Sequence, residues 1–227
     1  MSVEESIKNC VIYLKRIKQY DPDPFYVNYF FNEFINSINK TFDRIFEEAN
    51  RDFGLFISEK ISQETFQQKA NMKNDPNAIK FVEWYLAKYD KEHENPYPNF
   101  IKKICQLKKN FGKLPEIKIM LRASDRYKDD IYQQIKVNLK QSKIRSKEEL
   151  EIEIKRQLSV YLEIINHKRK QKNEPKVDGK QVKASAFLDI EDYKDIEISY
   201  ASEIYIPVLE RLVKESRNKI KELTSWN

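Results

Sequence analysis

Lys88 and His93 are the residues of this sequence whose types and spacing best suggest a chemistry, because a cation precedes an imidazole by five positions. The cation can stabilise negative charge that develops on a phosphate, and the imidazole can accept or donate the proton of a hydroxyl or a leaving oxygen. Histidine does so near neutral pH because its ordinary pKa is about 6.5. Glu92 and Glu94 flank the histidine and can orient it. The pair therefore suggests a site that cleaves a phosphodiester.

A simpler interpretation of the same pair stays open. Residues five apart on an α-helix point about 140° apart, so only long side chains, or a helix that unwinds at its end, bring them together. A cation and a histidine at an exposed helix end are also stabilised by the helix dipole without any catalytic role.

The pair lies at the end of a predicted helix that begins at Asp75 and Pro76. Aspartate is a favourable N-cap residue, and proline is favourable in the first turn. We expect this helix to end near His93, before a proline-rich loop at residues 95–98. Its buried stripe is formed by Ile79, Val82 and Leu86.

Apolar residues recur at helical spacing in six further segments, at about 3–20, 25–53, 64–72, 99–110, 146–167 and 198–223. The Asp21-Pro22-Asp23-Pro24 stretch separates the first two of these helices. Ser146 followed by Glu149 forms a capping box for the fifth. Pro207 predicts a kink in the last helix, or a later start for it.

The segment 117–140 is ambiguous between strand and helix. Ile117, Ile119 and Leu121 alternate with other residues, which is typical of a strand. A second alternating set begins at Ile135, so a hairpin around residues 124–130 fits, but Ile131 and Ile135 also fit a helix.

These elements predict a mainly α fold, an antiparallel helical bundle with an insertion. We expect the bundle core to comprise residues 1–98 and 187–227. The insertion, residues 99–186, is expected to be basic, to contain a β-hairpin and a long helix, and to pack on or beside the bundle.

The insertion is the second candidate site. Residues 101–183 hold 23 lysines and arginines against 11 acidic residues, whereas the rest of the chain is acidic on balance. Such a surface binds nucleic acid through phosphates, and Tyr127, Tyr132 and Tyr161 could stack on bases. The alternative is a solvated lysine-rich helix face. The candidate nucleic-acid-binding residues are Lys102, Lys103, Lys108, Lys109, Lys140, Lys143, Arg145, Lys168, Arg169 and Lys170.

Composition excludes several other classes of protein. Only three glycines occur in 227 residues, too few for Rossmann or P-loop phosphate binding. Cys10 and Cys105 form no metal-ligand pattern, and we expect two buried free thiols, although a disulfide between them stays open. The acidic spacings specify no metal, so we predict neither a metal nor a cofactor. An acidic N-terminus and the lack of a long apolar run favour a cytoplasmic protein with no membrane partner.

Three segments of the sequence resemble the HEPN superfamily, in particular its divergent archaeal branch. The segment NDPNAIKFVEWYLAKYDKEHENP looks like the motif-bearing helix of that branch, and ESIKNCVIYLKRIKQYDPDPFYVNYFFNEFINSINKTFD looks like its N-terminal helices. DIEDYKDIEISYASEIYIPVLERLVKE resembles its acidic, aromatic linker and final long helix. Residues 101–183 have no counterpart of this kind.

The resemblance implies an antiparallel helical bundle, commonly a homodimer in which the motif faces its twin. Many active members cleave RNA without a metal through an Arg-x4-His motif, with a small polar residue after the arginine. The arginine position falls on Lys88, the polar position on Tyr89 and the histidine on His93. Lysine lacks the bidentate fork of arginine, and tyrosine is larger than the usual residue. Both departures favour a non-catalytic member.

Three functions therefore stay open. The first is a non-catalytic module that binds RNA or a protein, with Lys88 and His93 vestigial. The second is a metal-independent endoribonuclease in which His93 is the general acid/base and Lys88 stabilises the phosphate charge. The third is a structural dimerisation protein.

Overall fold

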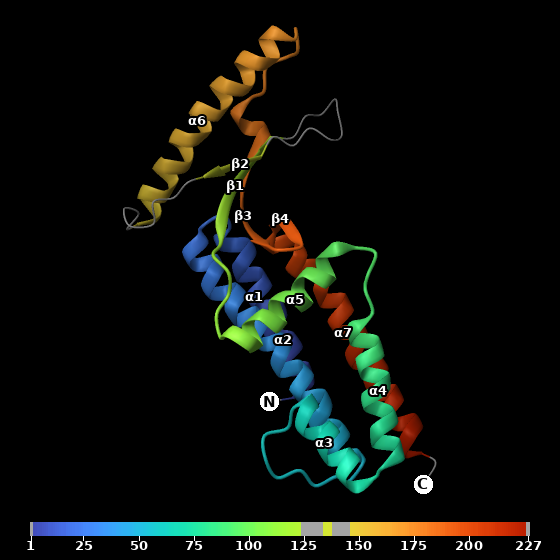
Figure 1. The fold of residues 1–227 in the computed structure, drawn as a ribbon. Coiled ribbons are helices and arrows are strands. Elements are labelled where there is room, and N and C mark those ends of the chain that lie inside the picture. Colours follow the sequence, from blue (N-terminus) through green and yellow to red (C-terminus); the bar gives the residue numbers. More distant parts are fainter. Residues whose placement is uncertain (1, 124–133, 138–145, 226–227) are drawn as a thin grey trace. The chain divides into compact units, whose positions relative to one another are not determined.

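The computed structural model describes residues 2–123, 134–137 and 146–225, which divide into two compact units (Figure 1). Unit 1 consists of Met1–Lys15, Phe31–Leu114 and Tyr200–Asn227. Unit 2 consists of Arg16–Phe30 and Pro115–Ser199. Helices α1 (Val3–Tyr20) and α2 (Pro24–Asp52) contribute residues to both units.

Polar side chains cap the starts of several helices, and Asp75 and Ser146 do so as the sequence predicts. Asp23 accepts backbone hydrogen bonds from Phe25 and Tyr26 at the start of α2. Ser62 caps α3 (Gln63–Lys73), Asp75 caps α4 (Pro76–Asp90), and Ser146 accepts the N–H of Glu149 at the start of α6 (Lys147–Gln171). The remaining helices are α5 (Pro96–Phe111) and α7 (Ile198–Thr224). α7 contains Pro207, so the later start that we considered for it is wrong.

Unit 1 is organised around an aromatic core. The ring of Phe46 on α2 lies 5.3 Å from Phe66 on α3, and 5.8 and 4.8 Å from Phe81 and Tyr85 on α4. Such edge and tilted contacts are favourable beyond the apolar area that they bury. α1 and α7 close the same core with further buried side chains, among them Val3, Val213 and Ile220.

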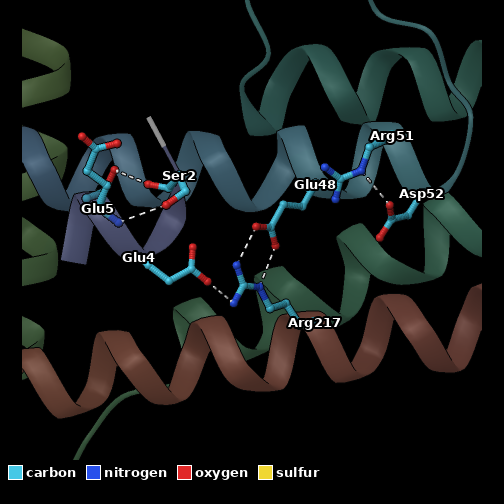
Figure 2. A network of polar contacts seen from close by, with 8 residues as sticks. Ser2, Glu4, Glu5, Glu48, Arg51, Asp52 and Arg217 are labelled. Carbon is cyan, nitrogen blue, oxygen red and sulfur yellow. Dashed lines mark hydrogen bonds and ion pairs between the residues drawn. The ribbon is translucent and has the colours of Figure 1, made fainter. Parts of the chain in front are cut away.

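Arg217 on α7 holds three helices of unit 1 together (Figure 2). Its guanidinium donates from Nε and Nη2 to the two carboxylate oxygens of Glu48 on α2, at 2.8 and 2.6 Å. Nη1 lies 2.5 Å from Oε1 of Glu4 on α1. Hydrogen bonding to Arg217 lowers the pKa of Glu4 to about 2. The bidentate pair is the geometry that favours arginine over lysine.

Unit 2 contains a four-stranded antiparallel sheet of order β2-β1-β3-β4 (Figure 1). The strands are β1 (Lys118–Ala123), β2 (Gln134–Val137), β3 (Val182–Ile190) and β4 (Tyr193–Glu197), and the short helix η1 (Gly179–Gln181) precedes β3. α6 packs beside this sheet, with Tyr161 and Ile165 in one cluster with Ile119 and Leu121 of β1.

Within segment 117–140, the described residues 118–123 and 134–137 form strands rather than a helix. β1 and β2 pair antiparallel, with Ile119 opposite Val137, so the hairpin and the long helix expected in the basic region are confirmed. Residues 124–133 lie outside the described residues.

The acidic segment 188–197 is not a linker but a β-hairpin, in which Leu188 pairs with Ile196. The Asp189 carboxylate accepts the N–H of Asp195 and lies 3.5 Å from Nζ of Lys118. Lys118, which is distant in sequence, thus neutralises one of the acidic residues that concealed this strand pair.

The fold is thus mainly α with a small antiparallel sheet, as expected. The chain passes from unit 1 to unit 2 after Leu114 and returns to unit 1 after Ser199. Helix α5, which we expected in the insertion, belongs to unit 1. We predict two domains from the sequence: a bundle core of residues 1–98 and 187–227, and an insertion of residues 99–186. This division stays a prediction. No helix in the described part of the chain is both long enough and apolar enough to span a membrane.

We predict that Glu48→Gln destabilises the protein more than Glu4→Gln does. The Glu48 side chain is 21% exposed and bonds Arg217 through both oxygens, whereas the Glu4 side chain is 62% exposed. Urea denaturation at pH 7 should show a loss of about 1 kcal/mol in the free energy of unfolding for Glu48→Gln, and less than about 0.5 kcal/mol for Glu4→Gln. Equal losses of unfolding free energy in the two variants would show that the Glu48–Arg217 pair is not the stronger of the two ion pairs.

Both cysteines are free and buried, as expected, and should resist alkylation in the native protein. Burial raises the pKa of Cys10 to about 12 and raises that of Cys105 further, so thiolate is scarce at pH 8. Mass spectrometry after iodoacetamide treatment should show no modification of the native chain and two modifications in urea. Rapid labelling without urea would show that this part of unit 1 opens readily.

Candidate functional site

His93 lies in a loop rather than on the last turn of α4. The helix ends at Asp90, and Lys91 leaves the helical region with φ −56° and ψ 120°. The expected helix end near His93 is therefore wrong by one turn. Asn95 is the reason, because it caps α5 and accepts the N–H of Tyr97, so the proline-rich segment 95–98 begins a new helix instead of forming a loop.

The main chain of His93 is fixed by the side chain of Asn99 on α5. The His93 N–H donates to Asn99 Oδ1 at 3.0 Å, and Asn99 Nδ2 donates to the His93 carbonyl at 2.9 Å. This two-way bond sets the position of a half-buried imidazole without using the ring nitrogens. In the described part of the chain, these bonds leave both ring nitrogens of His93 unused by Asn99.

Lys88 is committed to a different partner. Its Nζ lies 3.0 Å from Oε2 of Glu215 on α7 and 6.0 Å from the centre of the Trp84 ring. The positive charge that the motif would place on a phosphate is thus paired with a carboxylate. In the described residues, Lys88 and His93, which the sequence predicts to act together, are not joined by a hydrogen bond or an ion pair.

Other cations act on the charge of His93 instead. Burial lowers the pKa of the imidazole, and the positive charges of Lys102, Lys91 and Arg211 lower it further, in that order. Lys102 comes from α5, Lys91 from the end of α4 and Arg211 from α7. These three residues and His93 form the His93 cluster, which lies entirely within unit 1.

Lys102 is the most fixed member of the His93 cluster. Its Nζ donates to the carbonyl of Lys91 at 2.8 Å and lies 5.5 Å from the centre of the Tyr89 ring. Burial lowers its pKa, while Asp90 and Glu92 act in the opposite direction. Lys91 and Arg211 are both exposed. The cluster therefore combines one anchored cation with two that face solvent.

Tyr89, at the polar position of the motif, is a packing residue. Its ring stacks on Tyr85 at 6.1 Å and meets Phe42 edge-on at 5.3 Å. Burial raises the pKa of its hydroxyl well above the ordinary value. Tyr89 therefore packs in the core through its ring, and the ammonium group of Lys102 lies near the same ring.

The described candidate nucleic-acid residues are divided between the two units. Lys102, Lys103, Lys108 and Lys109 belong to unit 1, whereas Lys168, Arg169 and Lys170 belong to unit 2. Lys140, Lys143 and Arg145 lie outside the described residues. Lys103, Lys168 and Lys170 are exposed.

Three of these cations already serve the local structure. Lys108 donates to the Gly112 carbonyl at 2.7 Å and so helps to end α5. Lys109 is paired with Glu64 on α3. Arg169 donates to the Pro175 carbonyl at 2.6 Å and lies 3.7 Å from Glu174, which holds the chain after α6.

Tyr161 is unavailable for stacking on bases, which corrects that expectation. It is 2% exposed and lies in the cluster between α6 and β1. Burial raises the pKa of its hydroxyl. Tyr127 and Tyr132 lie outside the described residues.

Sequence reasoning missed Asn99, Lys91 and Arg211. No pattern in the neighbouring sequence indicates the role of Asn99, because that role is to bond the main chain of His93 in the preceding loop. Arg211 is 118 positions from His93 along the chain, so only the packing of α7 shows it. In residues 2–123, 134–137 and 146–225, no three histidine, cysteine or acidic side chains gather closely enough to hold a metal ion.

Comparisons with protein-family models, with curated proteins and with solved structures find no match for this chain.

We predict that His93 titrates below its ordinary pKa of about 6.5, and that Arg211→Gln moves its midpoint upward whereas Lys88→Gln does not. NMR titration of the imidazole signals measures both effects, and His167→Gln assigns the two histidines. A midpoint that responds to Lys88→Gln as strongly as to Arg211→Gln would show that Lys88 acts on the imidazole after all.

Proposed function

We propose that this protein binds RNA at the His93 cluster without cleaving it. The observation that supports the proposal is the positive field at His93, where Lys102 on α5, Lys91 after the end of α4 and Arg211 on α7 lower the pKa of one imidazole. A surface that holds several cations close together gains energy when a phosphate joins them and releases counterions. The fold of the HEPN type, and its homodimeric arrangement, belong to the same proposal.

The pairing of Lys88 supports a binding role over a catalytic one. A ribonuclease of the type that the motif suggests needs a cation free to stabilise the phosphate. Lys88 is bonded to Glu215, and Tyr89 fills the polar position with a packed ring. Phosphate contacts from Lys102, Lys91 and Arg211 need neither of these residues.

One observation favours metal-independent RNA cleavage as a second candidate function. Burial and the nearby cations lower the pKa of His93, which increases the share of neutral imidazole, the form that a general base requires. In that case Lys102 or Arg211, rather than Lys88, stabilises the charge on the phosphate.

Binding is tested with a fluorescent single-stranded RNA of about 20 nucleotides. Three phosphate contacts predict that affinity falls roughly 20-fold between 50 and 200 mM salt. Arg211→Gln combined with Lys91→Gln should reduce affinity about tenfold or more at low salt. Lys80→Gln, which removes an exposed lysine of α4, is the matched control and should change little. Binding that ignores salt, or that the double variant leaves intact, would refute the proposal.

Cleavage is tested on the same RNA in EDTA, with the wild-type protein and His93→Ala. The binding function predicts intact RNA with both proteins. Cleavage that wild type performs and His93→Ala lacks would establish the second candidate. The same reaction with Arg211→Gln would then show which cation serves it.

A further inference from the structure

Helix α6, the long helix of unit 2, has apolar side chains on the face that points away from the sheet (Figure 1). Tyr161 and Ile165 are buried in the cluster with β1. Ile152, in contrast, is 66% exposed, and Val160 and Ile164 are each 48% exposed. These three residues fall within a sector of about 120° on a helix of 3.6 residues per turn. We call them the α6 stripe.

The two ends of α6 carry opposite charges. Residues 148–153 hold four glutamates and no basic residue, and residues 167–172 hold four lysines and arginines and no acidic residue. Glu148, Glu151, Lys168 and Lys170 are all exposed. A helix of this kind is complementary to a second copy of itself that lies antiparallel to it, because each acidic end then meets a basic end.

The register of such a pair follows from the spacing of the α6 stripe. A two-fold axis near residue 158 brings Ile152 of one copy to the level of Ile164 of the second copy, with Val160 beside the axis. The same axis brings Glu148 to the level of Lys168. The apolar contacts and the ionic contacts therefore require the same register. A parallel pair would instead place like charges together at both ends, which is unfavourable.

Arg156 lies between Ile152 and Val160 along the helix, and its charge is matched within α6. Its Nε and Nη2 donate to the two carboxylate oxygens of Glu153, at 2.9 and 2.7 Å. The methylene groups of an arginine held in this way can cover apolar surface while the guanidinium stays at the rim. Arg156 is therefore compatible with an apolar contact at the middle of α6.

We propose that α6 pairs antiparallel with α6 of a second copy of this chain, through the α6 stripe and the opposite charges at its ends. The pairing lies in unit 2 and does not rest on RNA binding at the His93 cluster. It also differs from the homodimer that the HEPN resemblance implies, which would join two copies at the motif in unit 1. Three apolar side chains per copy make a small interface, so we expect a Kd on the order of 10 μM.

Sedimentation of the full chain from about 1 to 200 μM tests the pairing, and wild type should pass from monomer to dimer over this range. Ile152→Ser combined with Ile164→Ser should raise the dimer Kd about tenfold or more, because it removes most of the apolar contact. Ile12→Ser is the matched control, because Ile12 is an isoleucine of α1 that is 43% exposed. This variant should dimerise as wild type does.

Charge reversal tests the complementarity of the two ends. Glu148→Lys combined with Glu151→Lys makes both ends of α6 basic, and Lys168→Glu combined with Lys170→Glu makes both ends acidic. Each variant alone should be monomeric at concentrations at which wild type dimerises. An equimolar mixture of the two should form a heterodimer, because every end then meets the opposite charge. A mixture that stays monomeric would contradict the proposed ionic contacts.

Cross-linking with a short bis-maleimide tests the antiparallel direction, and the buried native thiols should not interfere. Ser159→Cys places a thiol beside the two-fold axis and should give cross-linked dimer. Lys170→Cys should give none, because the two copies of this position lie about 36 Å apart along the paired helices. A cross-link at position 170, a dimer that the α6 substitutions leave intact, or a wild-type chain that stays monomeric at about 200 μM would overturn the proposal.

Discussion

The packing of α7 against α1, α2 and α4 is the interaction on which the rest of unit 1 depends. Val213 and Ile220 of α7 share one core with Val3, Phe46 and the aromatic residues of α4. Ion pairs fix the rotation of α7 about its own axis. Arg217 pairs with carboxylates on α1 and α2, and Glu215 pairs with Lys88 on α4. This rotation brings the exposed Arg211 to the loop of His93.

The His93 cluster follows from this arrangement together with two local rules. Asn95 begins α5 directly after the loop, so α4 cannot continue to His93. Asn99 then lies one turn into α5, where its amide bonds the His93 main chain in both directions. The main chain beside the imidazole is therefore held by Asn99, and the pKa of the imidazole is lowered by Lys102 on α5, Lys91 after α4 and Arg211 on α7.

The sequence predicts the helices well and the candidate site less well, for a physical reason. Helix ends depend on nearby residues, and Asp23, Ser62, Asp75 and Ser146 cap the helices that they precede. Side-chain partners depend on packing between distant segments, so Arg211 and the burial of Tyr161 could not be predicted. The β3–β4 hairpin was missed because its acidic residues conceal the alternation of a strand.

The division of unit 1 among three chain segments has a consequence for biosynthesis. The ribosome makes residues 115–199 after α1, α2 and α4 but before α7. Unit 2 thus has all its residues while unit 1 still lacks the helix that covers its core. At about 5–20 residues per second these 85 residues take roughly 4–17 s, during which the apolar faces of unit 1 stay open on the nascent chain. Translation speed through unit 2 thus sets how long these apolar faces wait for α7.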